Sequence, residues 1–161
     1  MHANLQKILD MPSNQIDRAP KALPTGWYIA TVQGQPEYGE SKQQATPFYN
    51  FEMRIVDAYK DVDDDAMEEF LTLLDGSNRV LNEVIITNTY YLTPKAMGRL
   101  AQFLDHLEGL KPNDAAKETA KVSQRISETN GKTCLIHIRH EPWQSGEGVS
   151  ARIDQTMIYE D

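Results

Sequence analysis

Alternating apolar and polar positions predict a β-strand with one buried face over residues 48–56. The apolar set is Tyr49, Phe51, Met53 and Ile55, and the set between them is Phe48, Asn50, Glu52 and Arg54. Successive side chains of a strand point to opposite faces of its sheet. We therefore expect the first set in a core and the second at the surface.

Four further segments are rich in β-branched and aromatic residues and lie between turn-forming residues, which predicts strands. They are residues 27–32, 79–91, 133–140 and 149–154. Residues 37–47 are polar and contain Gly39 and Pro47, so we expect an exposed hairpin loop between the first two strands. Asn130 and Gly131 predict the turn into the fourth strand.

A period of three to four residues predicts a helix between the third and fourth strands. Thr93 suits the N-cap, Pro94 suits the first helical position, and Gly109 suits the C-terminal stop. The apolar stripe between them is Ala96, Met97, Leu100, Phe103, Leu104 and Leu107. We expect this stripe to fill the core, and a second, more polar helix over residues 113–128 to lie on the surface.

The predicted order of three strands, a helix and two strands is the connectivity of the five-stranded oligonucleotide-binding (OB) barrel. A mixed α+β sandwich fits the same order and stays open as an alternative. A chain of 161 residues is of the usual size for one domain. We therefore predict a mainly β protein with a flexible N-terminal arm over residues 1–22 and a single OB-fold domain over residues 23–161.

The formal net charge of −8 is unusual for a nucleic-acid binder, but the acids are unevenly placed. Eight acids fall between Asp57 and Asp75 against one base, Lys60, and the rest of the chain is nearly neutral. We interpret residues 57–76 as a solvated, regulatory acidic insertion. The remaining surface is then free to be basic.

Composition also predicts the compartment. Cys134 is the only cysteine, so no internal disulfide forms. No stretch approaches the roughly 20 apolar residues of a membrane span, and the first residues lack the apolar run of a signal peptide. We expect a soluble protein of the cytoplasm, with no membrane partner.

Metal and catalytic motifs fail on inspection. Asp61, Asp63 and Asp65 have EF-hand spacing, but Ala66 and Thr72 stand where the loop needs Gly and Glu. Three-residue steps along the strand over 133–140 put its cysteine and two histidines on opposite faces, which rules out one shared zinc ion. No nucleophile, P-loop or dinucleotide motif occurs, so we expect no cofactor, no metal and no enzyme.

Cations and spare aromatics favour single-stranded nucleic acid as a ligand. If Cys134, Ile136 and Ile138 face inward, the strand cations face outward, and two lysines lie in turns: Arg54, His137, Arg139, Arg152, Lys42 and Lys132. The candidate stacking residues are Trp27, Tyr38, Phe48, one of Tyr90 and Tyr91, and Trp143. Arginine and lysine hold phosphates while aromatic faces stack bases. Ordinary solvated arginines and aromatics that cover barrel ends are the alternative at each position.

Several motifs together resemble the phage-encoded single-stranded DNA-binding proteins with an OB fold. They are Leu23-Pro24-x-Gly26-x-Tyr28, Gly39-x-Ser41-Lys42, Thr46-Pro47-Phe48, Leu92-Thr93-x-x-Ala96-x-x-Arg99-Leu100-x-x-Phe103-Leu104 and Asn130-Gly131-Lys132. The resemblance implies a sequence-independent coat for single-stranded DNA in phage replication or recombination, in the host cytoplasm. Acidic segments would recruit replication or recombination proteins.

Two other functions remain open on the sequence. In the first, the chain is a protein-interaction module whose acidic insertion mimics DNA or docks a basic partner. In the second, which the clustered carboxylates do not favour, it is a nuclease. Oligomeric state is undetermined, and a homo-oligomer is compatible with the sequence.

Overall fold

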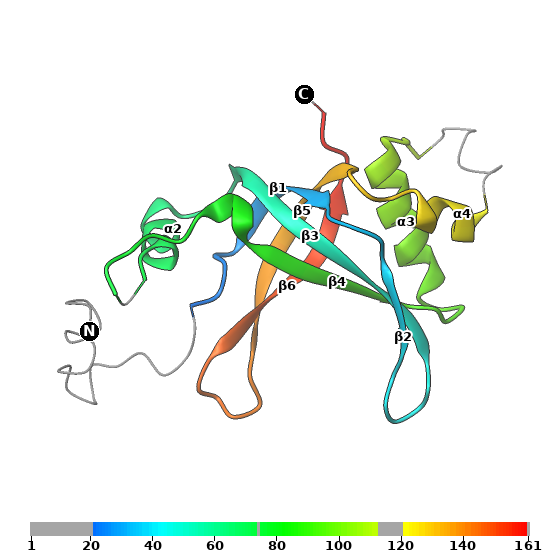
Figure 1. Ribbon diagram of the computed structural model, residues 1–161, viewed down its shortest axis with the longest axis horizontal. Coiled ribbons are helices and arrows are strands. Elements are labelled where there is room, and N and C mark those ends of the chain that lie inside the picture. The colour runs from blue at the N-terminus through cyan, green and yellow to red at the C-terminus, as the bar shows by residue number, and fades with distance from the viewer. Residues whose placement is uncertain (1–20, 74, 113–120, 161) are drawn as a thin grey trace.

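The computed structural model describes residues 21–73, 75–112 and 121–160 (Figure 1). The predicted arm over residues 1–22 lies outside this part of the chain, except for Lys21 and Ala22. The same holds for residues 113–120 of the predicted second helix. No helix in the described ranges is long and apolar enough to cross a membrane, and no group of three or more His, Cys, Asp or Glu residues there could hold a metal ion.

The described fold is mainly β, with one antiparallel sheet and a few short helices. The strands are β1 (Gly26–Val32), β2 (Glu37–Glu40), β3 (Pro47–Lys60), β4 (Ile85–Tyr91), β5 (Thr133–Pro142) and β6 (Val149–Met157). The sheet order is β2-β3-β1-β5-β6, and β4 pairs with β3. The helices are α2 (Asp64–Leu71), the 3₁₀ turn η2 (Leu81–Glu83), α3 (Met97–Glu108) and α4 (Val122–Ser127).

The extra strand, β2, forms inside the predicted loop and continues the line of β1 along β3. Val32 of β1 lies opposite Met53, and Glu37 of β2 lies opposite Asn50, so β1 and β2 follow one another along the same edge of β3. Gly34, with φ of 80°, lies in the break. The prediction of an exposed loop over residues 37–47 is therefore wrong at its start, where β2 forms.

The sheet is not closed into a barrel, whereas the sequence predicts a five-stranded barrel. β4 pairs with β3, and β6 pairs with β5, but β4 and β6 form no strand pairing with each other. Side chains of α3 span the gap instead. Arg99 donates from Nη2 to the Asp154 carbonyl at 3.5 Å, and His106 Nδ1 lies 2.7 Å from Thr156 Oγ1.

Helix α3 packs where the sequence predicts. Gly109 ends the helix with φ of 72°, as predicted, but α3 begins at Met97 with Ala96 as its N-cap residue, so the predicted start at Thr93 and Pro94 is wrong. Thr93 Oγ1 instead accepts a hydrogen bond from the Ala96 amide at 3.2 Å in the turn before the helix. Its buried residues, Leu100, Phe103, Leu104 and Leu107, belong to the predicted stripe. Phe103 stacks on Tyr90 and meets Phe51 edge-on, with ring centroids 5.1 and 5.0 Å apart. The helix thereby joins the core-facing sides of β3 and β4.

The inward-facing strand residues are confirmed. Phe51, Met53 and Ile55 of β3, and Cys134, Ile136 and Ile138 of β5, are all fully buried. Burying side chains of this size contributes about 1.5–3 kcal/mol each. The period-two pattern thus identifies the inward face of both strands, although Leu135 on the other face of β5 is also buried, at 4% exposed.

Helix α4 is not confined to the surface, contrary to the sequence prediction. Ile126 is buried in the core, and Arg125 is only 5% exposed. The Arg125 guanidinium is 2.8 Å from Asp105 and 2.6 Å from Glu108 on α3. Burial disfavours its charge, but hydrogen bonds to the two carboxylates outweigh burial and raise the pKa of Arg125. A polar helix can dock in this way because its buried cation is paired.

The acidic segment is also folded rather than simply solvated. Residues 57–60 complete β3, and Asp63 caps α2 by accepting a hydrogen bond from the Ala66 amide at 2.9 Å. Phe70 on this helix is 3% exposed and belongs to the core, with the Arg79 guanidinium 4.2 Å from its ring centre. The acids lie on the outer side of a docked helix.

Cys134 should be chemically inert in the folded protein. Its side chain is fully buried, and burial raises the pKa of the thiol to about 12. Because the thiolate is the reactive form, we expect no labelling by a thiol-reactive dye at about pH 8 in native buffer and complete labelling in guanidinium chloride. Rapid labelling of the native protein would contradict the buried position of β5.

Candidate nucleic-acid interface

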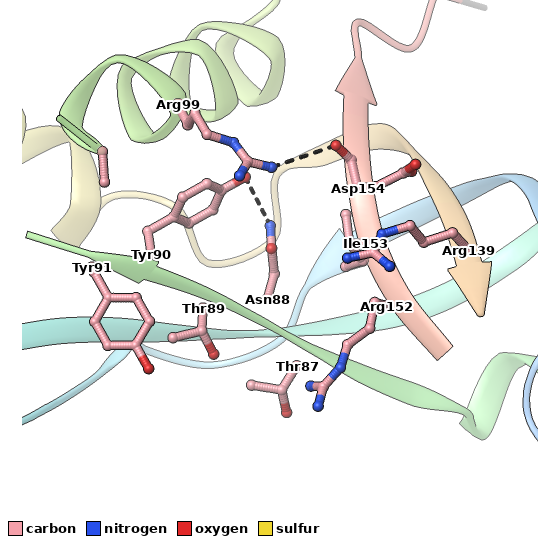
Figure 2. Close-up of a pocket in the computed structure, with 11 residues that line it drawn as sticks. Thr87, Asn88, Thr89, Tyr90, Tyr91, Arg99, Arg139, Arg152, Ile153 and Asp154 are labelled. Atoms are coloured by element: carbon pink, nitrogen blue, oxygen red, sulfur yellow. Dashed lines mark hydrogen bonds between the residues drawn. The ribbon is translucent and has the colours of Figure 1, made fainter. Parts of the chain in front are cut away.

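A groove of about 370 Å³ follows the gap between β4 and the β5–β6 hairpin (Figure 2). It is lined by Thr87, Asn88, Thr89, Tyr90, Tyr91, Ala96, Arg99, Arg139, Arg152, Ile153 and Asp154. We call this set the arginine groove. It exists because β4 and β6 diverge, leaving their facing edges unpaired with each other.

Three arginines reach the arginine groove from three different elements. Arg99 extends from α3, while Arg139 and Arg152 lie directly opposite each other on β5 and β6. The side chains of Arg139 and Arg152 are 51% and 58% exposed. The one acid in the lining, Asp154, directs its carboxylate to His137, with Oδ1 2.6 Å from Nδ1. The lining therefore has a surplus of positive charge.

A row of side chains on β4 forms the polar wall of this groove. Thr87, Thr89 and Tyr91 alternate along the strand and project to the same side, and Arg152 reaches toward this row from β6 (Figure 2). The two threonine hydroxyls are engaged by β3. Thr87 donates to Glu52 at 2.9 Å, and Thr89 donates to Asn50 at 2.6 Å.

Tyr91 is the exposed aromatic of the groove. Its side chain is 46% exposed and meets the Phe48 ring edge-on at 5.7 Å. Phe48 in turn covers Gly39, where a Cβ atom would come within 2.6 Å of the phenyl ring. The neighbouring Tyr90 instead packs in the core, and burial raises its pKa to about 12. Of the two tyrosines proposed from the sequence, Tyr91 is therefore the one that a base can reach.

A second hollow continues from Tyr91 toward the β2–β3 turn. Its lining is Ser41, Lys42, Gln43, Gln44, Thr46, Tyr91 and Thr93. The turn is ordered by hydrogen bonds, because the Thr46 amide donates to Ser41 Oγ at 2.9 Å and the Ser41 amide donates to the Thr46 carbonyl at 2.9 Å. Since Tyr91 lines both hollows, one polar surface runs from Lys42 to the three arginines.

Two of the sequence candidates pack against each other rather than standing free. Trp27 is 9% exposed, and its ring lies 5.0 Å from the His137 ring. Lys60 covers the Trp27 ring at 5.9 Å, and His137 is held by Asp154. Trp27 therefore has little surface left for a base.

Other candidates lie apart from the arginine groove. Tyr38 packs edge-on against Tyr49, on the core-facing side of β3, whereas Phe48 is on the other side. Lys132 precedes β5, about 23 Å along the strand from Arg139 at the usual rise per residue. Arg54 donates to the Asn82 carbonyl at 3.3 Å beside η2.

Trp143 is half-buried in the β5–β6 hairpin, where Nε1 donates to Ser150 Oγ at 2.8 Å.

The negative charge of the acidic segment is separated from this site. Helix α2 lies at the end of the sheet opposite α3, and the β2–β3 and β5–β6 hairpins both project toward the bottom of the view, apart from each other (Figure 1). Exposed charges more than about 10 Å apart are largely screened at 0.1 M salt. The overall charge of −8 thus does not prevent a basic groove.

Comparison with known proteins gives no family. No protein-family model matches the chain, and no curated protein matches it. A solved structure described as yeast RPA bound to ssDNA is 7% identical, and the alignment covers 98% of this chain and 87% of that chain with a TM-score of 0.31. Functional assignment therefore rests on the geometry of the site itself.

Proposed function

We propose that this protein binds single-stranded DNA without marked sequence preference and without catalysing a reaction. The observation that carries the proposal is the convergence of Arg99, Arg139 and Arg152 with exposed Tyr91 in one groove. Cations for phosphates beside an aromatic face for bases are the two elements that single-strand binding requires.

We also propose that the fold is an OB fold opened between β4 and β6, which correspond to the third and fifth strands of the five-stranded OB barrel. Taking β1 and β2 as one broken strand, the pairings β1 with β3, β3 with β4, β1 with β5 and β5 with β6 follow the OB connectivity, and α3 lies between β4 and β5. In OB folds, ligands bind across the second and third strands between two flanking hairpins. The arginine groove occupies the corresponding place beside β4.

The chemistry of the groove favours contacts that every sequence can make. Arginine guanidinium groups recognise phosphate, which is common to all nucleotides, and Tyr91 offers a π-face that any base can stack on. Thr87 and Thr89 already donate to β3, so they have no free donor proton for base edges. We accordingly propose a coating role of the kind that the phage resemblance implies, in DNA replication or recombination.

A binding titration tests this function. We expect a fluorescein-labelled oligo-dT of about 16 nucleotides to be bound with an affinity that falls as salt rises, with a slope of about −0.7 per phosphate contact. A duplex of the same length should bind much more weakly, because its bases are stacked inside the helix and unavailable to Tyr91. Equal affinity for duplex, or no binding at low salt, would refute the proposal.

Replacing Tyr91 with alanine should weaken oligo-dT binding about 10-fold, because one base–aromatic stack contributes roughly 1–3 kcal/mol. Tyr91→Phe keeps the ring and should keep most of the affinity. Tyr59→Ala is the matched control, since Tyr59 is 48% exposed but does not line the groove. Equal losses for Tyr91→Ala and Tyr59→Ala in a fluorescence anisotropy titration would remove Tyr91 from the site.

A further inference from the structure

One carboxylate lies between two arginines of the groove. Oε2 of Glu141 is 3.6 Å from Nη2 of Arg139 and 3.5 Å from Nε of Arg152. The three side chains are about half exposed, with Glu141 at 50%. A single oxygen atom thus faces two guanidinium groups at a place open to solvent.

An anion beside Arg139 and Arg152 stabilises the free protein. Arg139 and Arg152 are directly opposite on β5 and β6, and like charges at such positions repel each other. Glu141 is two residues beyond Arg139 on the same strand, so its side chain is on the same face. The carboxylate relieves this repulsion in the free protein.

The contact is nevertheless loose. Charge-assisted hydrogen bonds between N–H and a carboxylate are about 2.7–2.9 Å long, and both distances to Glu141 exceed that range. Each guanidinium offers five N–H donors in a planar fork, and one shared oxygen cannot use them all. Arg139 and Arg152 therefore retain N–H donors that a second anion can use, either beside the Glu141 carboxylate or in its place.

We propose that Arg139 and Arg152 form a phosphate subsite and that Glu141 occupies it until a backbone phosphate of single-stranded DNA displaces the carboxylate. This inference rests on the proposed function. A phosphodiester has the same single negative charge as the carboxylate and presents two unesterified oxygens, one for each fork. Because exposed ion pairs are weak, displacing the glutamate costs little.

The inference predicts that removing the competitor tightens binding. Glu141→Gln should bind oligo-dT about 2- to 5-fold more tightly than the wild-type protein at low salt, which is the range expected for loss of one exposed ion pair. The salt dependence should also steepen, by up to about one phosphate contact. Glu147→Gln is the matched control, because Glu147 is exposed in the turn of the same hairpin and its replacement removes the same charge.

The comparison between the two variants decides the outcome. Tighter binding by Glu141→Gln alone supports the subsite. Equal affinities of the two variants, or weaker binding by Glu141→Gln, would overturn it while leaving the proposed function intact. Failure of the wild-type protein and both variants to bind oligo-dT would instead overturn the proposed function, and the subsite with it. Circular dichroism of each variant confirms that the fold is unchanged.

Discussion

Replacing Arg99, Arg139 and Arg152 together with alanine should weaken oligo-dT binding about 100-fold at about 0.1 M salt. Each phosphate contact to a single strand contributes about 0.7 to the salt exponent, so three contacts correspond to about two decades at this salt concentration. The slope of log affinity against log salt should become shallower by about 2. Arg139 and Arg152 are more than half exposed, and Arg99 is exposed with a long hydrogen bond of 3.5 Å to the Asp154 carbonyl, so the fold should survive the triple replacement.

A control of equal charge separates local contacts from overall electrostatics. Lys60, Lys111 and Lys121 are exposed and lie outside the arginine groove. Their combined replacement by alanine changes the net charge by the same amount, and we expect less than about a 5-fold loss of affinity, because screened distant charges contribute little. Similar losses in the two triple variants, measured by anisotropy titration at several salt concentrations, would show that the groove is not the binding site.

Replacing Phe70 with alanine should destabilise the protein by about 3 kcal/mol, because removal of a buried phenylalanine costs about 3–5 kcal/mol. Phe70 is 3% exposed and anchors α2 to the core, with Arg79 against its ring. A fall in Tm of about 10 °C corresponds to this loss in a domain of this size. Urea denaturation measures the free energy of unfolding directly.

Tyr59→Ala serves as the control within the same acidic segment. Tyr59 is 48% exposed, so its loss should cost less than about 1 kcal/mol. If Phe70→Ala were as stable as Tyr59→Ala, α2 would not be docked on the core.

A docked helix also means that deleting residues 57–76 removes core structure. A partner-docking role for the acids is better tested by neutralising exposed carboxylates such as Asp64 and Glu68.

The sequence predicted those parts of the fold that depend on local periodicity. The inward faces of β3 and β5 and the stripe of α3 follow directly from periods of two and of three to four residues. These periods are clearest where one face is buried, as in residues 51–55 of β3 and in α3. In β5 the pattern is interrupted, because Leu135 is also buried between Cys134 and Ile136. The Gly109 stop was predicted from a residue type that suits the left-handed conformation at a helix end, whereas the predicted Thr93 cap lies one turn before the observed N-cap residue, Ala96.

The parts that the sequence missed depend on contacts between distant segments. Met67, Phe70 and Leu71 have the three- and four-residue spacing of a helix face within the acidic run, but a pattern this short does not show that the face packs on the core. The charge of Arg125 predicts a surface position, and its burial is possible only because Asp105 and Glu108 of α3 pair with it in the folded protein. The open edge between β4 and β6 is a property of sheet geometry and leaves no periodic signal.

The candidate site was predicted only in part, because it also depends on contacts between distant segments. Arg139 and Arg152 were proposed from strand alternation, and the structure brings them together, with Lys42 and Phe48 bordering the same surface through Tyr91. Arg99 was missed as a site residue because its role depends on how α3 meets the sheet edge. A basic residue flanking the apolar stripe near the start of a core helix is the signal that could have suggested it.

Chemical-shift mapping tests the central claim most directly. In a titration of ¹⁵N-labelled protein with oligo-dT, we predict that the largest shifts fall on backbone amides of β4 from Thr87 to Tyr91 and on the side-chain Nε–H groups of Arg99, Arg139 and Arg152. Amides of α2 should not move. Shifts that cluster on α2, or that leave β4 and the three arginines unchanged while DNA is bound, would contradict the assignment of the arginine groove as the binding site.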